Sequence, residues 1–363
     1  MNHNKVKQSS SGLSEKIFYL REKSLKRKKI NNNLIDIPVA FWIKEDRLLN
    51  EVGKEFNIIL RTPGCYWALS KTGGCSMCGY VEDAYMGTIT PENLINQFDY
   101  AVSKKIDEIK SDNNGYVLKI FNSGSFFDER EIPKAVSEEI FNKIKNLPNI
   151  KEVVFESRPE FIKKKRIKAM KEILDDKYVE IGIGIETTNN YIRNIYINKG
   201  MKYEVFLRAV EDLKNLDVGT KAYLLFKPPF LTEQAAIDDC RTSIRKLIDL
   251  KVNTISINPV NIQKGSFVEY LWYRKKYRPP WFYSLFECLN QSITQKDLKT
   301  TRIISDPSGA GSQRGIHNCK NFECNDSMKN ALRDFVLSQD LTKLEIQEKC
   351  ECKKIYELKK DFI

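Results

Sequence analysis

The chain has 363 residues, of which 41 % are hydrophobic and 30 % charged, a composition typical of folded globular proteins rather than disordered ones. Its formal net charge of +12 favours a polyanionic partner, most often nucleic acid. No apolar run is long enough to span a bilayer, and the polar start lacks the apolar core of a secretory signal. We therefore expect a cytoplasmic protein that does not enter a membrane.

Residues 1–33 form a basic, polar first segment. It is either a solvated tail or loose helix, or an arm that touches nucleic acid. Ile17, Leu20 and Leu25 would lie on one side of such a helix and could dock it.

Strand and helix patterns alternate from residue 34 to about 265, which predicts an α/β fold of parallel βα units. Thr90 and Pro91 mark one helix start, because threonine caps a helix and proline suits its first turn. Six such units fit a partial (β/α)6 TIM-like barrel over 34–265, with 266–363 as a C-terminal extension. The expected strands cover residues 56–60, 116–121, 152–156, 179–185, 221–226 and 253–257.

Three cysteines, Cys65, Cys75 and Cys78, follow the first expected strand with C-x9-C-x2-C spacing. Three thiolates make a poor closed zinc site, because structural zinc takes four protein ligands. They suit a [4Fe–4S] cluster with one open iron, which can bind S-adenosylmethionine (SAM). A zinc knuckle completed by a distant cysteine remains the alternative.

The cysteine loop resembles that of the radical-SAM superfamily, although the x9 gap departs from the family's usual x3. The closer resemblance is to the radical-SAM subunit of archaeosine synthase, in the branch that includes the catalytic subunit of Elongator. It covers roughly residues 35–358. The blocks that carry it include TPGCYWALSKTGGCSMCGY, FNSGSFFDE, FESRPEFI, IGIGIET, KAYLLFKPPF, NPVNIQKGSFVEYLW and RGIHNC.

The resemblance and the strand ends together predict the residues that contact SAM. The turn after the second strand meets the SAM amino group in radical-SAM enzymes, although it also reads as a plain strand-end turn. Charged side chains after the third strand either line the site or form an ion-pair network. The lysine after the fifth strand faces either the ligand or solvent. The predicted cofactor-binding residues are Tyr80, Asn122, Ser123, Gly124, Ser125, Glu156, Arg158, Glu186 and Lys227, with Glu186 placed to hold the ribose hydroxyls.

Two basic stretches, at 163–166 and 274–278, are candidates for contact with phosphates. Aromatic residues interleave with the second stretch, and flat rings stack on unpaired bases. The first stretch also fits an exposed helix face, and the aromatic residues also fit core packing.

Four more cysteines occur as two pairs, Cys319 with Cys324 and Cys350 with Cys352. Four thiolates in two pairs predict a structural zinc site that staples the extension to the barrel. A second iron–sulfur cluster and free thiols are alternatives, and His317 could replace one cysteine.

The resemblance also implies a reaction and partners. In archaeosine formation a lysine transferase, ArcS, attaches lysine to the preQ0 base at position 15 of the tRNA D-loop. The radical-SAM subunit then cleaves the lysine carbon–nitrogen bond, which requires tRNA, an electron donor and a complex with ArcS. Another Elongator-like RNA-modifying enzyme is one alternative. A zinc-dependent nucleic-acid-binding protein without catalysis is another.

Overall fold

The computed structural model describes residues 12–28, 32–345 and 350–362. Eight strands form one curled sheet in the order of the sequence, and all are parallel except β1, which runs antiparallel to β2. The strands are β1 (Ala40–Arg47), β2 (Val52–Ile59), β3 (Tyr116–Phe121), β4 (Ile150–Glu156), β5 (Tyr178–Glu186), β6 (Gly219–Phe226), β7 (Thr254–Pro259) and β8 (Arg302–Ile304). The six expected strands are β2 to β7, so the predicted partial barrel is confirmed, and β1 and β8 extend it at its two edges.

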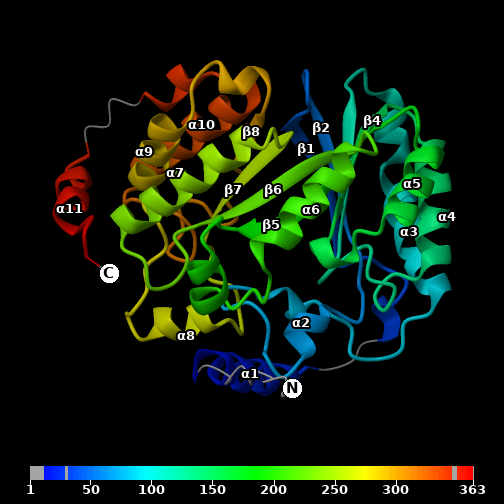
Figure 1. The fold of residues 1–363 in the computed structure, drawn as a ribbon, viewed down its shortest axis with the longest axis horizontal. Helices are drawn as coiled ribbons and strands as arrows, with labels where there is room; N and C mark the ends of the chain where they lie inside the picture. The colour runs from blue at the N-terminus through cyan, green and yellow to red at the C-terminus, as the bar shows by residue number, and fades with distance from the viewer. Residues whose placement is uncertain (1–11, 29–31, 346–349, 363) are drawn as a thin grey trace, which may run out of the picture.

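Helices connect the parallel strands and cover the outside of the sheet (Figure 1). Thr90 caps α3 as expected: its hydroxyl accepts from the backbone of Asn93, whose side chain accepts from the Thr90 backbone. The helices are α1 (Gly12–Leu25), α2 (Tyr66–Leu69), α3 (Pro91–Ser111), α4 (Lys134–Lys145), α5 (Lys164–Ile173), α6 (Tyr203–Lys214), α7 (Glu233–Asp249), α8 (Phe267–Tyr273), α9 (Phe282–Ser292), α10 (Phe322–Ser338) and α11 (Cys352–Lys359). No helix among the described residues is long and apolar enough to cross a membrane.

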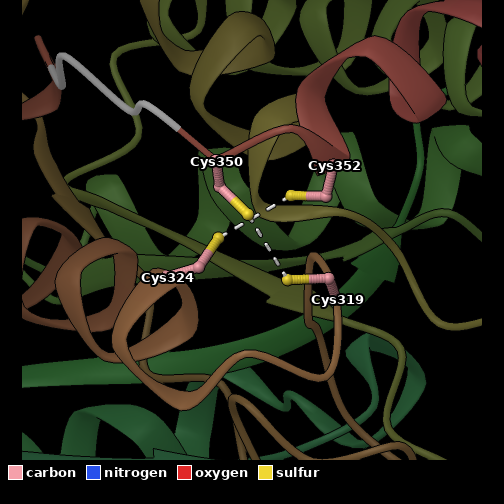
Figure 2. A group of neighbouring side chains, drawn as sticks. All are labelled: Cys319, Cys324, Cys350 and Cys352. Atoms are coloured by element: carbon pink, nitrogen blue, oxygen red, sulfur yellow. Dashed lines mark hydrogen bonds between the residues drawn. The ribbon is translucent and has the colours of Figure 1, made fainter.

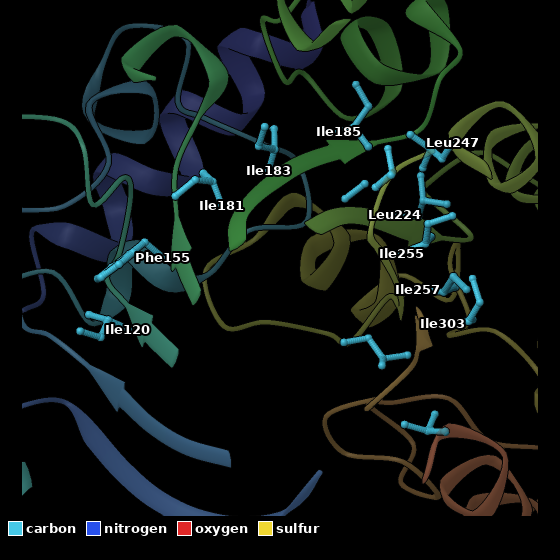
Figure 3. Packing of buried hydrophobic residues seen from close by; sticks show 14 of the residues in the cluster. Ile120, Phe155, Ile181, Ile183, Ile185, Leu224, Leu247, Ile255, Ile257 and Ile303 are labelled. Carbon is cyan, nitrogen blue, oxygen red and sulfur yellow. The ribbon is translucent and has the colours of Figure 1, made fainter. Parts of the chain in front are cut away.

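The main core lies between the sheet and these helices (Figure 3). Alternate residues of each strand point outward, and each of the strands β2 to β7 contributes two to four aliphatic or aromatic side chains to this layer. Examples are Ile120 of β3, Phe155 of β4, Ile183 of β5, Leu224 of β6 and Ile257 of β7, all buried. Burial of this apolar surface supplies most of the driving force for folding.

The other face of the sheet, which lines the inside of the half-barrel, is charged instead of aliphatic. Lys119 Nζ lies 2.6 Å from Asp46 and 2.5 Å from Glu55. Arg302 donates to Glu152 and Glu180, each at 2.8 Å. Buried charges require close partners, and these pairs supply them. The interior therefore differs from the apolar interior of an ordinary (β/α)8 barrel.

Side chains link the two edge strands of the open barrel. Arg302 of β8 donates to the carbonyl of Arg47 in β1 at 3.0 Å. Gln339, just after α10, pairs with both backbone groups of Ile303, at 2.9 and 2.8 Å, as a neighbouring strand would. The short β8 comes from the segment 266–363, so this segment continues the sheet of the barrel.

Candidate active site and metal centre

The three cysteines of the first cluster lie in one loop at the carboxyl end of β2. Cys65 is the N-cap of α2, and Cys78 N donates to the carbonyl of Cys75 at 3.2 Å. Burial raises the pKa of the Cys75 thiol to about 11 and also raises the pKa values of Cys65 and Cys78, and each thiol acts electrostatically on another. The three thiols are therefore close enough to influence one another, and burial disfavours their ionised forms. Positively charged iron favours the thiolates, so the donor set fits an iron–sulfur cluster.

A segment after β5 holds this loop in place. Asn198 Nδ2 donates to the carbonyls of Thr72 and Gly74 at 3.0 and 2.8 Å, and Trp67 donates to Asn198 O at 2.8 Å. Ser76 Oγ donates to a backbone carbonyl of the same segment at 2.9 Å. These bonds fix the loop without using the thiols.

The turn at residues 122–125 lies against the cysteine loop. A Cβ added to Gly124 would meet the Cα of Cys65 at 2.7 Å and Glu131 Oε1 at 1.9 Å, so only glycine fits here. Asn122 Oδ1 and Ser123 Oγ are buried and have no hydrogen-bond partner among the described residues. Unpartnered buried polar atoms are costly, and a polar ligand beside the loop would satisfy them.

Glu131 organises this turn, which the sequence did not reveal. Its carboxylate accepts from Ser125 N at 3.0 Å, Asn122 Nδ2 at 2.8 Å and Thr62 Oγ1 at 3.1 Å. Burial raises the pKa of Glu131 to about 7. Asp128, an acid nearby in sequence, is instead paired with Arg130 at 2.6 Å.

Charged residues at the ends of β4 and β5 border the same loop. Arg158 pairs with Glu160 at 2.5 Å, and its backbone N donates to Ser125 Oγ at 3.0 Å. Glu186 is 2.7 Å from Lys199 Nζ. Both basic groups act electrostatically on the Cys75 thiol, so these ion pairs lie next to the cysteines.

Glu156 differs from these neighbours, because it has no ion pair within the described part of the chain. Burial raises the pKa of its carboxyl group, while Tyr223 and Lys221 act in the opposite direction. The hydroxyl of Tyr80 lies within electrostatic reach of Glu156, although 58 % of the Tyr80 surface is exposed. Glu156 therefore keeps its carboxyl group free of a direct ion pair, although Lys221 and Lys199 act on it electrostatically.

The side chain of Lys227 makes its contacts away from the residues around the cysteine loop. Its Nζ lies 2.6 Å from Glu233 and donates to the carbonyl of Arg278 at 3.0 Å. The hydroxyl of Tyr277 donates to the Lys227 carbonyl at 2.6 Å. Burial lowers the pKa of Lys227. The other predicted cofactor residues lie together around the cysteine loop, whereas the Lys227 amino group is held by the C-terminal extension.

Sequence similarity connects the chain to known proteins over nearly its whole length. No model of a protein family matches the sequence. It is 36 % identical to archaeosine synthase subunit beta of Methanosarcina acetivorans over 91 % of this chain and 92 % of that protein. The identity to archaeosine synthase subunit beta of Thermococcus kodakarensis is 35 %, over 88 % and 95 % of the two chains. The chain belongs to the archaeosine synthase subunit beta family.

Membership in this family confirms the family resemblance that the sequence predicted. An uncharacterized protein of Methanocaldococcus jannaschii is 44 % identical over 93 % of this chain and 90 % of that protein. Solved structures of similar fold include queuine lyase from Clostridium spiroforme, with a TM-score of 0.43 and 22 % identity over 64 % of this chain and 91 % of that chain. Another is Methanocaldococcus infernus Elp3, with a TM-score of 0.49 and 17 % identity over 68 % of this chain and 59 % of that chain.

The four C-terminal cysteines of this family member form a second group (Figure 2). All four sulfur atoms lie within 4.8 Å of one another, with 3.9 Å between Cys319 and Cys350 and 3.8 Å between Cys324 and Cys352. Four thiolates about 2.3 Å from one tetrahedral zinc ion would be about 3.8 Å apart. The group has the size of a single-ion site and could hold a metal.

Nearby N–H groups point at these sulfurs, as they do around metal-bound thiolates. Asn321 N donates to Cys319 Sγ at 3.4 Å, and Asn318 Nδ2 donates to Cys324 Sγ at 3.7 Å. His317 is not in the group, and its Nδ1 lies 2.8 Å from the carbonyl of Gly315. Burial lowers the pKa of His317 to about 4.

We expect Cys352→Ser to remove the metal from the C-terminal site and lower the melting temperature by roughly 5 °C or more, because a structural site's binding energy is folding energy. Metal analysis and thermal unfolding check this, with Cys240→Ser, a buried cysteine of α7, as the control. Iron uptake should stay unchanged. Full retention of zinc in the Cys352→Ser protein would contradict the assignment.

Proposed function

We propose that this chain cleaves the lysine carbon–nitrogen bond of the preQ0-lysine adduct at position 15 of tRNA, leaving archaeosine. Full-length similarity to two archaeosine synthase beta subunits carries this proposal. The presence of Cys65, Cys75 and Cys78 in one loop, beside a turn with unsatisfied polar groups, supports it independently. The reaction would take place in the cytoplasm, where tRNA is modified.

We assign the [4Fe–4S] cluster to Cys65, Cys75 and Cys78. With SAM bound and one electron from an external donor, this centre would supply the radical chemistry that removes the unactivated hydrogen beside the lysine nitrogen. The chain's own residues would bind SAM and the substrate and orient them. Asn122 would accept from the amino-acid part of SAM and Ser123 would donate to it, and Glu186, which pairs with Lys199, would hold the ribose hydroxyls. Glu156, which has no direct ion pair among the described residues, would suit a cationic group of SAM or substrate.

We assign zinc to Cys319, Cys324, Cys350 and Cys352, because the spacing of the sulfurs fits one tetrahedral ion. Tyr283 OH lies 3.4 Å from Cys352 Sγ, and the ring of Tyr356 in α11 packs 5.3 Å from the ring of Tyr283. Zinc would thus hold α11 against α9, at the side of the barrel where Glu233 and Lys227 pair.

The tRNA surface that we propose is a basic and aromatic face made by α1 and α8. Lys16 Nζ of α1 and the Arg274 guanidinium after α8 lie 4.5 and 3.6 Å from the ring centre of Tyr270. Tyr273 is 68 % exposed, and Lys275 beside it is also exposed. This face adjoins the cysteine loop, because α8 donates a backbone N–H to the Ser76 carbonyl there. Exposed cations and rings beside the cluster loop suit an RNA strand with an unstacked base.

The remainder of the second basic stretch is used inside the protein. Arg278 donates to the carbonyls of His317 and Asn318 at 2.7 and 2.8 Å, and burial lowers its pKa to about 10. Trp281 and Tyr283 are buried, so they pack in the core. Arg166 of the first stretch donates to the Phe127 carbonyl at 2.7 Å. We therefore place phosphate contacts at the exposed lysines, not at these residues.

The names of the relatives indicate that this protein works with a second subunit. "Subunit beta" implies a second subunit, and we propose that it is the lysine transferase ArcS, which would pass the adduct on directly. An electron donor must reduce the cluster.

The reconstituted protein should convert lysine-adduct tRNA to archaeosine-containing tRNA with SAM and a reductant, at a yield that nucleoside mass spectrometry can follow. Matched tRNA that carries preQ0 without lysine is the control and should stay unchanged. Formation of 5′-deoxyadenosine without loss of lysine from the adduct would overturn the proposed reaction while leaving the cofactors in place.

A further inference from the structure

Helix α1 lies across the cysteine loop, although its sequence resembles a solvated basic segment (Figure 1). Arg21 Nη2 donates to the carbonyl of Cys78 at 2.8 Å, and Arg21 Nε donates to the carbonyl of Gly73 at 3.2 Å. Ser14 Oγ donates to the Thr72 carbonyl at 3.2 Å, and Ser24 bonds to Glu82 beyond the last cysteine. The helix is therefore bonded to the loop on both sides of Cys75 and Cys78.

The approach between helix and loop is close. Gly73 has a φ of +71°, and a Cβ there would lie 2.4 Å from the backbone nitrogen of Phe18. Ile17 of α1 belongs to the same buried apolar cluster as Cys75, with Cys78 packed against it. Water is thus excluded from one side of the two cysteines by α1 itself.

Arg21 is an unusual residue for this position. Its side chain is buried, with 2 % exposure of the residue, and among the described residues no carboxylate pairs with it. Its Nη1 is buried and has no hydrogen-bond partner in the part of the chain that the structure describes. A buried guanidinium held by two carbonyl groups still lacks an anion, which is costly. Arg21 acts electrostatically on the Cys78 thiol, which can become anionic on metal binding and belongs to the residue whose carbonyl Arg21 contacts.

We propose that α1 is an integral wall of the cluster site and that Arg21 is a positioning and charge-compensating residue for the cluster held by Cys78. Three thiolates and a [4Fe–4S] core together are a net anion, and reduction by the external one-electron donor adds a further negative charge. A fixed cation with a free N–H stabilises the reduced form and raises the midpoint potential. This inference rests on the cluster of the proposed function and on neither its tRNA nor its reaction.

The test compares Arg21→Gln, which removes the charge, with Arg21→Lys, which keeps it. Lys23→Gln, at an exposed position two residues further along α1, is the control. The midpoint potential of the reconstituted cluster and the rate of iron loss to a chelator are measured without tRNA. Arg21→Gln should shift the midpoint to more negative values and speed iron loss several-fold. Arg21→Lys should lie nearer the wild type, and Lys23→Gln should match it.

Equal midpoints and equal iron loss in Arg21→Gln and Lys23→Gln would overturn the inference. If Arg21→Gln takes up no cluster, the Arg21→Lys protein provides the deciding comparison. An Arg21→Lys protein that also takes up no cluster would overturn the charge role, whereas one that takes up the cluster with a midpoint near the wild type would support it. A wild-type protein that binds no cluster would instead refute the proposed function, so the two failures are distinguishable.

Discussion

Cys75→Ala is expected to abolish cluster uptake and 5′-deoxyadenosine formation while the barrel stays folded. Cys75 is the most buried of the three loop cysteines, but the loop is held by Asn198, Ser76 and Trp67 through bonds that do not involve its sulfur. The thiol therefore serves the cofactor and contributes little to the fold. Iron and sulfide analysis, absorbance near 400 nm and product chromatography measure the loss.

Cys240→Ala is the matched control, because Cys240 is also buried but packs in α7 as part of the main core. It should lose some stability and keep the cluster. Normal iron content with 5′-deoxyadenosine production in Cys75→Ala would contradict the assignment of the cluster ligands.

Most of the barrel could be predicted because its signals are local. The strands β2 to β7 are apolar runs separated by amphipathic helices, and their spacing alone predicts parallel units. The edge strands carry no such signal. β1 reads AFWIKEDR, in which the polar half faces charged partners, and β8 has only the three residues RII. β8 exists because β7 and the Gln339 side chain pair with it from either side, which no local pattern can show.

In the candidate site, too, the features with a local sequence signal could be predicted and the others could not. The cysteine loop was recognisable from spacing, and the turn at 122–125 from its place after a strand. The roles of Arg21 and Glu131 could not be recognised from the sequence, because each residue resembles its exposed neighbours in sequence. Arg21 stands in a basic run, and Glu131 follows Asp128 and Glu129. Only the path of the chain shows that Arg21 and Glu131 point inward while Glu129 stays exposed.

Glu131→Gln should weaken SAM binding roughly 10- to 100-fold, with cluster content unchanged. The carboxylate accepts from Thr62, Asn122 and Ser125 through both oxygens. An amide must turn its NH₂ group toward at least one of these donors. Losing a charge-assisted hydrogen bond costs about 1.5–3 kcal/mol, which sets the expected loss in affinity. The dissociation constant for SAM measures it.

The pH dependence of SAM binding separates a positioning role from mere stability. Burial raises the pKa of Glu131 to about 7, so its ionised form, which accepts all three bonds, becomes dominant only as the pH rises through that value. Wild-type affinity for SAM should therefore increase from pH 6 to pH 8, as fewer molecules carry the protonated carboxyl group. Glu131→Gln cannot titrate and should lack this step. Glu129→Gln, whose side chain is 67 % exposed, should retain both the step and the affinity. A wild-type step that persists in Glu131→Gln would assign it to another group and leave Glu131 as a purely structural residue.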